Sequence, residues 1–119
     1  MRTTDIRYIV LHCSATRSTQ DYSPEALEHD HRARGFRGIG YHYYVRRSGE
    51  VIPCRPLDQI GAHVRGYNAC SWGVCYEGGL DPNGKATDTR TEAQKVALRQ
   101  LLVQLKALAP QAEIVGHRD

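Results

Sequence analysis

The sequence predicts a mixed α/β domain in which a central β-sheet is flanked by helices. Short segments rich in β-branched and aromatic residues, typical of buried strands, alternate along the chain with two segments that carry helix caps. The length of 119 residues suits one hydrophobic core, so residues 1–119 are expected to form a single domain. No internal repeat divides the chain.

The first half of the chain contains a strand, a helix and a hairpin. Residues 6–12 are apolar and β-branched and predict a buried strand. Ser23 and Pro24 are a favourable N-cap and first-turn pair for a helix that ends near Gly35. Residues 41–47 and 50–53 flank Ser48-Gly49, the pattern of a β-hairpin.

The second half contains a long loop, a strand, a second helix and a last strand. Residues 55–71 show no periodicity and predict a loop of a length that is usually functional or disordered. Residues 72–76 predict a strand. Thr91 and Gln94 form a capping box before a helix with a leucine face, which Pro110 ends. Residues 113–116 predict the final strand.

Composition excludes several classes of protein. Hydrophobic residues make up 40% and charged residues 24%, which excludes a disordered or collagen-like chain. No apolar run is long enough to cross a bilayer, and the polar N-terminus does not resemble a signal peptide. The net charge of +3 is scattered, so no nucleic-acid partner is expected. The four cysteines predict free thiols, with a Cys70–Cys75 bridge as the alternative.

Histidines are the residues most informative about chemistry. His12 ends the first predicted strand and His117 follows the last one. Ligand sites in open α/β sheets gather at the carboxyl ends of strands, so these two imidazoles are candidate ligands of one Zn²⁺. The alternative is two ordinary loop histidines.

The other candidates each have a plain structural alternative. His63, in the long loop, is either a wall of a substrate cleft or a solvated loop residue. Tyr41 is a candidate donor to an oxyanion or a packed aromatic residue. His29 and His31 are expected on the solvent face of the first helix. Cys13 invites a nucleophile interpretation, but it should point away from its neighbour His12.

Six short motifs occur in an order that resembles one enzyme family. They are residues 10–16 (VLHCSAT), 40–42 (GYH), 61–63 (GAH), 66–68 (GYN), 72–75 (WGVC) and 116–119 (GHRD). Together they resemble the zinc-dependent N-acetylmuramoyl-L-alanine amidases of the type-2 amidase family, which includes phage endolysins and is related to peptidoglycan recognition proteins.

The resemblance implies a role for each matching residue. His12 and His117 match zinc ligands, and Tyr41 matches the catalytic tyrosine. His63, Asn68 and His42 match residues that line the substrate groove. The implied substrate is the amide bond between N-acetylmuramic acid and L-alanine in peptidoglycan. The family's third zinc ligand lies beyond the position of Asp119, so a truncated domain with impaired zinc binding is also expected.

The resemblance leaves a second function open. A peptidoglycan-binding module of the same fold that does not cleave its ligand is the alternative, and a regulatory partner of a polymerase is a more distant one. Without a signal peptide, an amidase of this kind is expected to be made in the cytoplasm and to reach the cell wall after release or export. No membrane partner is expected.

Overall fold

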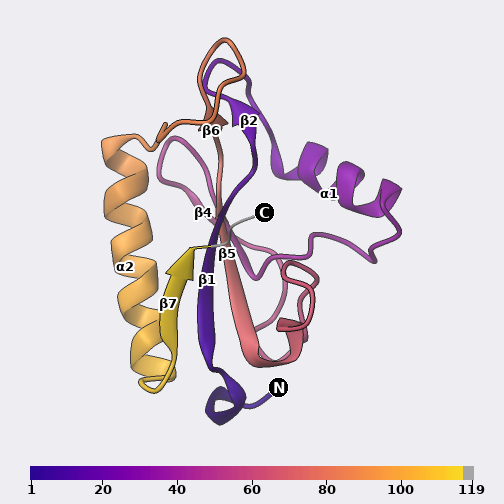
Figure 1. The fold of residues 1–119 in the computed structure, drawn as a ribbon, viewed down its shortest axis with the longest axis vertical. Coiled ribbons are helices and arrows are strands. Elements are labelled where there is room, and N and C mark those ends of the chain that lie inside the picture. The colour runs from indigo at the N-terminus through magenta and orange to yellow at the C-terminus, as the bar shows by residue number, and fades with distance from the viewer. Residues whose placement is uncertain (117–119) are drawn as a thin grey trace.

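The structure is a computed structural model that describes residues 1–116, and it confirms the mixed α/β class (Figure 1). A five-stranded sheet has the order β4-β3-β5-β1-β7. Its strands are β1 (Tyr8–Cys13), β3 (Tyr43–Val45), β4 (Val51–Pro53), β5 (Ser71–Tyr76) and β7 (Glu113–Gly116). Only the β3–β4 pair is antiparallel; the β1–β5, β1–β7 and β3–β5 pairs are parallel.

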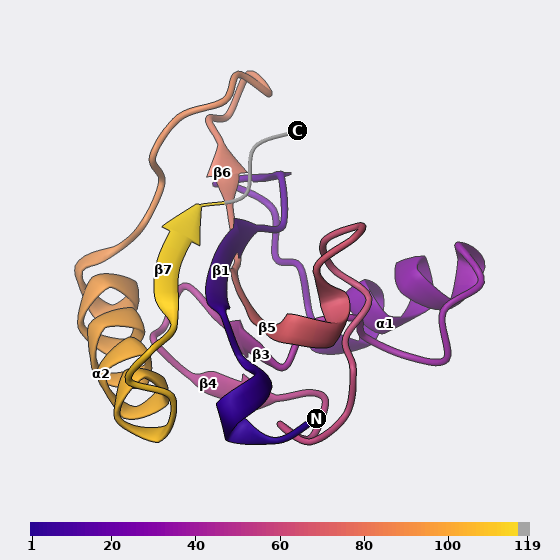
Figure 2. The same ribbon diagram turned by 60° about the horizontal axis from the view of Figure 1, so that its bottom comes forward.

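Two α-helices cover opposite sides of the sheet, as Figures 1 and 2 show. Helix α1 (Pro24–Ala33) begins at Ser23, whose side chain accepts a hydrogen bond from the Ala26 backbone N–H. Helix α2 (Glu92–Leu108) begins at the predicted Thr91–Gln94 capping box. Both helix starts therefore follow the sequence prediction.

Four short elements were not predicted. A two-stranded parallel sheet pairs β2 (Thr16–Arg17) with β6 (Gly79–Leu80) beyond the carboxyl end of β1. Two 3₁₀ turns, η1 (Thr3–Asp5) and η2 (Asn68–Cys70), precede β1 and β5, and η2 interrupts the loop expected over residues 55–71. The hairpin strands are also shorter than the predicted 41–47 and 50–53.

The sheet separates two apolar clusters. Helix α2 packs on a cluster that includes Ile9, Trp72 and Leu105, each at most 1% exposed. Helix α1 packs on a smaller cluster that includes Leu27, Tyr44 and Cys75. All four cysteines are free thiols, as the sequence predicted. None of the helices in the described part of the chain is long and apolar enough to span a membrane.

Candidate active site

His12 reaches the α1 side of the sheet near the carboxyl end of β1. Ile9 and Leu11 pack in the cluster under α2, and side chains alternate along a strand, so His12 projects from the opposite face. The His12 ring is 6% exposed, and its Nε2 lies 2.8 Å from Nδ1 of His63. The structure therefore brings together two of the predicted site residues that are 51 positions apart.

The loop that carries His63 is held by side-chain hydrogen bonds. Asn68 Oδ1 accepts the backbone N–H groups of His63 and Val64, each at 2.9 Å. Ser71 Oγ lies 3.3 Å from His63 Nε2 and donates to the Tyr67 carbonyl at 2.7 Å. The contacts of the Asn68 side-chain oxygen are thus with the backbone of its own loop, and they shape the loop beside His12.

Tyr41 stands next to the two histidines. Its ring centroid lies 5.0 Å from that of His12 and 6.4 Å from that of His63. Burial raises the pKa of the Tyr41 hydroxyl far above its ordinary value, and the neighbouring Cys75 side chain adds to the shift. The hydroxyl is therefore protonated near neutral pH and can act as a hydrogen-bond donor.

His31 belongs to this site, contrary to its predicted place on the solvent face of the first helix. The ring is 5% exposed, and Nδ1 accepts the Gly40 backbone N–H at 2.9 Å. Its centroid lies 5.3 Å from that of Tyr41. Burial lowers the pKa of His31, so the neutral ring is favoured. His31 follows Leu27, the other buried residue of α1, by four positions, and this spacing on one helix face is the one weak indication of its burial in the sequence. His29, by contrast, is exposed as predicted.

His42 is placed differently from the other predicted substrate-binding residues. It is fully buried; its Nδ1 accepts the Gly73 backbone N–H at 3.0 Å, and its Nε2 donates to the Gln59 carbonyl at 2.8 Å. Burial lowers the pKa of this ring. The geometry therefore favours a structural role for His42, which links β5 to the 54–62 segment, over contact with a ligand.

The predicted metal site is only partly within the described residues. Among residues 1–116, no group of three or more histidine, cysteine, aspartate or glutamate side chains is arranged to hold a metal ion. His117, the second predicted zinc ligand, lies outside the described residues. His12 supplies an imidazole of the kind that zinc accepts as a ligand.

A cleft of about 840 Å³ opens over His12, Tyr41 and His63. The exposed side chains of Arg34 and Arg65 lie on its wall and make the opening electropositive. Its remaining lining residues are His12, Cys13, Ser14, Ala15, His31, Phe36, Tyr41, Ala62, His63, Val64, Gly66 and Asn68. Cys13 thus lines the cleft as well, and it is exposed whereas His12 is buried.

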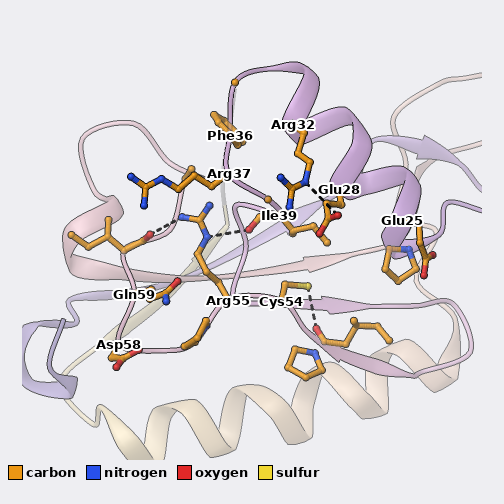
Figure 3. A pocket seen from close by; sticks show the side chains of 18 of the residues that line it. Glu25, Glu28, Arg32, Phe36, Arg37, Ile39, Cys54, Arg55, Asp58 and Gln59 are labelled. Carbon is orange, nitrogen blue, oxygen red and sulfur yellow. Dashed lines mark hydrogen bonds and ion pairs between the residues drawn. The ribbon is translucent and has the colours of Figure 1, made fainter.

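A larger cavity of about 1210 Å³ lies between α1 and residues 52–62 (Figure 3). In it, Arg55 donates to the carbonyls of Ile39 and Ile60, at 3.1 and 2.7 Å, and Arg32 pairs with Glu28. None of the described residues that line it is a histidine. The smaller cleft, which adjoins this cavity at Phe36 and Ala62, is therefore the candidate active site.

Comparison with known proteins identifies the family. Residues 2–119 match the family model described as N-acetylmuramoyl-L-alanine amidase. The chain belongs to this family. Among relatives of this amidase-family chain, the endolysin of Klebsiella phage KP32 is 42% identical over 93% of the chain and 74% of the relative. The endolysin of Escherichia phage T7 is 38% identical over the same shares.

Solved structures share the amidase fold. The N-acetylmuramoyl-L-alanine amidase LysC from Clostridium intestinale superposes with a TM-score of 0.83 at 27% identity, covering 97% of this chain and 72% of that one. A complex of the peptidoglycan recognition proteins LCa and LCx bound to tracheal cytotoxin gives a TM-score of 0.81 at 25% identity, covering 98% of this chain and 73% of the other. The predicted resemblance to amidases and recognition proteins is therefore confirmed.

Proposed function

We propose that this chain is a zinc-dependent N-acetylmuramoyl-L-alanine amidase that cleaves the amide bond between N-acetylmuramic acid and L-alanine in peptidoglycan. The observation that carries the proposal is the group of His12, His63 and Tyr41 that lines one cleft, in a chain of the amidase family. The related phage endolysins support the cell wall as the place of action.

The proposed metal site uses His12 and His117. When bound, a zinc ion would supply a water of lowered pKa and polarise the scissile carbonyl. Tyr41 contributes a neutral hydroxyl beside His12, and in our proposal it donates to the oxyanion that develops on the carbonyl. The loop carrying His63 and Asn68 lines the same cleft as His12 and Tyr41.

The charge of the cleft suits the proposed substrate. Peptide stems of peptidoglycan carry free carboxylates, and Arg34 and Arg65 place two guanidinium groups at the cleft opening. A relative of the same fold, the LCa–LCx complex, is bound to tracheal cytotoxin, which supports peptidoglycan fragments as ligands. We propose His63 and Asn68 as cleft-wall residues beside that ligand, and we leave His42 out of the proposed contacts because it is fully buried.

The proposal is tested by incubating the chain with purified peptidoglycan and measuring the release of stem peptides with a free L-alanine amine by mass spectrometry. We expect release that a chelator abolishes and added zinc restores, and bound zinc in the purified chain. His12→Ala should lose both zinc and peptide release, whereas His29→Ala, on the exposed face of α1, should retain both.

A second function is favoured by one specific observation, the similarity of this fold to that of peptidoglycan recognition proteins in a complex with tracheal cytotoxin. This second function is that of a binding module: the chain binds peptidoglycan without cleaving it. Binding to peptidoglycan with no peptide release at any zinc concentration would establish the binding module and refute the amidase.

A further inference from the structure

A chain of hydrogen bonds runs from His12 to the backbone of the long loop. His12 Nε2 lies 2.8 Å from His63 Nδ1, and His63 Nε2 lies 3.3 Å from Ser71 Oγ. Ser71 Oγ also lies 2.7 Å from the Tyr67 carbonyl oxygen. Ser71 is fully buried, so its hydroxyl exchanges no hydrogen bonds with bulk solvent.

The carbonyl at the end of this chain sets the direction of every hydrogen bond in it. A carbonyl only accepts, so the single hydroxyl proton of Ser71 is donated to Tyr67, and Ser71 Oγ accepts from His63 Nε2–H. A neutral imidazole has one N–H group, so His63 Nδ1 carries a lone pair. His63 Nδ1 therefore accepts from His12 Nε2–H, and the lone pair of His12 lies on Nδ1.

Two glycines fix the position of the His63 ring. A Cβ atom at Gly73 would lie 2.7 Å from Cγ and Nδ1 of His63, and one at Gly61 would lie 2.7 Å from its Cδ2. Both distances are shorter than real side-chain contacts, so the ring occupies space that only glycine leaves open. The Asn68 side chain holds the His63 backbone at the same time.

We propose that His63 and Ser71 are positioning residues that hold His12 as its Nε2–H tautomer and so present Nδ1 as the metal-binding nitrogen. Histidine ligands of metals commonly donate their second ring N–H to an acceptor, which fixes the tautomer and the orientation of the ring. Here the acceptor is a second imidazole, itself oriented by a buried serine. The metal-binding part rests on the proposed function, whereas the tautomers are a property of the chain itself.

The tautomers can be measured without metal. We would label the histidines with ¹⁵N and record long-range ¹H–¹⁵N spectra of the metal-free chain at about pH 8, where ordinary imidazoles are neutral. We expect protonated Nε2 in both His12 and His63. Ser71→Ala should turn His63 into a mixture of tautomers. Ser23→Ala removes a serine hydroxyl that caps α1 and takes no part in these hydrogen bonds, so it should leave the tautomers of both rings unchanged. A protonated Nδ1 in His12, or unchanged tautomers in Ser71→Ala, would overturn the proposal.

A pair of substitutions at His63 separates positioning from simple packing. The amide oxygen of His63→Gln can still accept the His12 N–H, whereas His63→Leu removes the acceptor. Zinc affinity, measured by competition with a chelating dye, should fall about ten- to a hundredfold in His63→Leu and stay near that of the unsubstituted chain in His63→Gln. Equal affinities of two folded variants would contradict the positioning role. If no form binds zinc, the proposed function fails. The tautomer spectra still decide which ring nitrogen of His12 carries the proton.

Discussion

At the scale of single residues, burial favours neutral side chains beside His12. Burial raises the pKa of Tyr41 and lowers that of His31, so both groups are uncharged near neutral pH. Their rings lie 5.3 Å apart. In the proposed reaction, a neutral Tyr41 can donate its proton in a hydrogen bond to a developing oxyanion. A neutral His31 beside it adds no positive charge that would repel the proposed metal ion.

Tyr41→Phe tests the role of this hydroxyl. The substitution keeps the ring contacts with His12 and His31 and removes only the donor, so folding and zinc content should be unchanged. We expect kcat for peptide release to fall about 10²- to 10³-fold, the usual cost of losing one oxyanion donor. Tyr8→Phe, at a ring that packs on Tyr67 outside the cleft, is the matched control. An unchanged kcat in Tyr41→Phe would exclude the hydroxyl from catalysis.

The limits of sequence interpretation are also clear at single residues. His12 and Tyr41 were found because they belong to recognisable motifs and because strand ends meet at one edge of a sheet. His31 was misplaced because the first helix is mostly polar, so that a buried histidine on its inner face leaves little signal. The contact between His63 and Ser71 depends on the path of an aperiodic loop, which no residue pattern specifies.

At the scale of elements, Glu77 joins three parts of the fold. It follows β5, and its carboxylate accepts the backbone N–H groups of Tyr22, before α1, and of Arg47, after β3. Arg46 Nε also donates to it at 2.9 Å. Burial alone would raise the pKa of Glu77, but these hydrogen bonds outweigh it and hold the pKa below its ordinary value.

Glu77→Gln should therefore destabilise the fold by about 1.5–3 kcal/mol, the usual contribution of hydrogen bonds to a charged group. Because the folded pKa is lowered, this stabilisation is present above the ordinary value of about 4.5 and is lost as the pH falls through the folded pKa. Urea unfolding at pH 7 and at pH 3 measures both effects. The difference between Glu77→Gln and the unsubstituted chain should shrink at the lower pH, and Glu50→Gln, at an exposed carboxylate, should change little at either.

The start of α2 makes a second prediction at this scale. Thr91 Oγ1 accepts the Gln94 N–H at 3.0 Å and donates to the Arg47 carbonyl at 2.6 Å, so the cap also ties the helix to the segment after β3. Thr91→Ala should lower the free energy of unfolding by about 0.5–2 kcal/mol. Thr91→Ser keeps the hydroxyl and should restore most of it. Equal losses in the two variants, measured by urea unfolding, would show that the methyl group rather than the cap matters.

Elements differed in how far the sequence determines them. The caps of α1 and α2 are local and were predicted, as were the segments that form β1, β5 and β7. The β2–β6 pair joins residues 16–17 to residues 79–80, and two residues are too few to show any alternation. Such a pair forms because the longer strands bring the segments together, so it follows from the fold and not from a local pattern.

At the scale of the whole molecule, the two faces of the sheet carry different features: the larger apolar cluster lies on one face and the cleft opens on the other. The larger apolar cluster lies under α2 and includes Ile9, Trp72 and Leu105, while the cleft opens on the α1 side. Alternation along β1 produces this division, because Ile9 and Leu11 face α2 and His12 faces the cleft. The apolar cluster on the α1 side is smaller, so polar residues such as His31 and His42 complete the packing there.

This packing makes the stability of the molecule sensitive to mild acid. Burial lowers the pKa values of His31 and His42, so below the ordinary pKa of 6.5 the unfolded chain binds protons that the folded chain does not. The free energy of unfolding should therefore decrease as the pH is lowered from 6.5 to the folded pKa values. The decrease is at most about 1.4 kcal/mol per pH unit for each histidine. Urea unfolding at a series of pH values between 7.5 and 5 measures this slope. His31→Gln, which can still accept the Gly40 N–H, should reduce the slope, and His29→Gln on the exposed face of α1 should not. An identical slope in the two variants would mean that His31 takes up protons equally in the folded and unfolded states, against the lowered pKa.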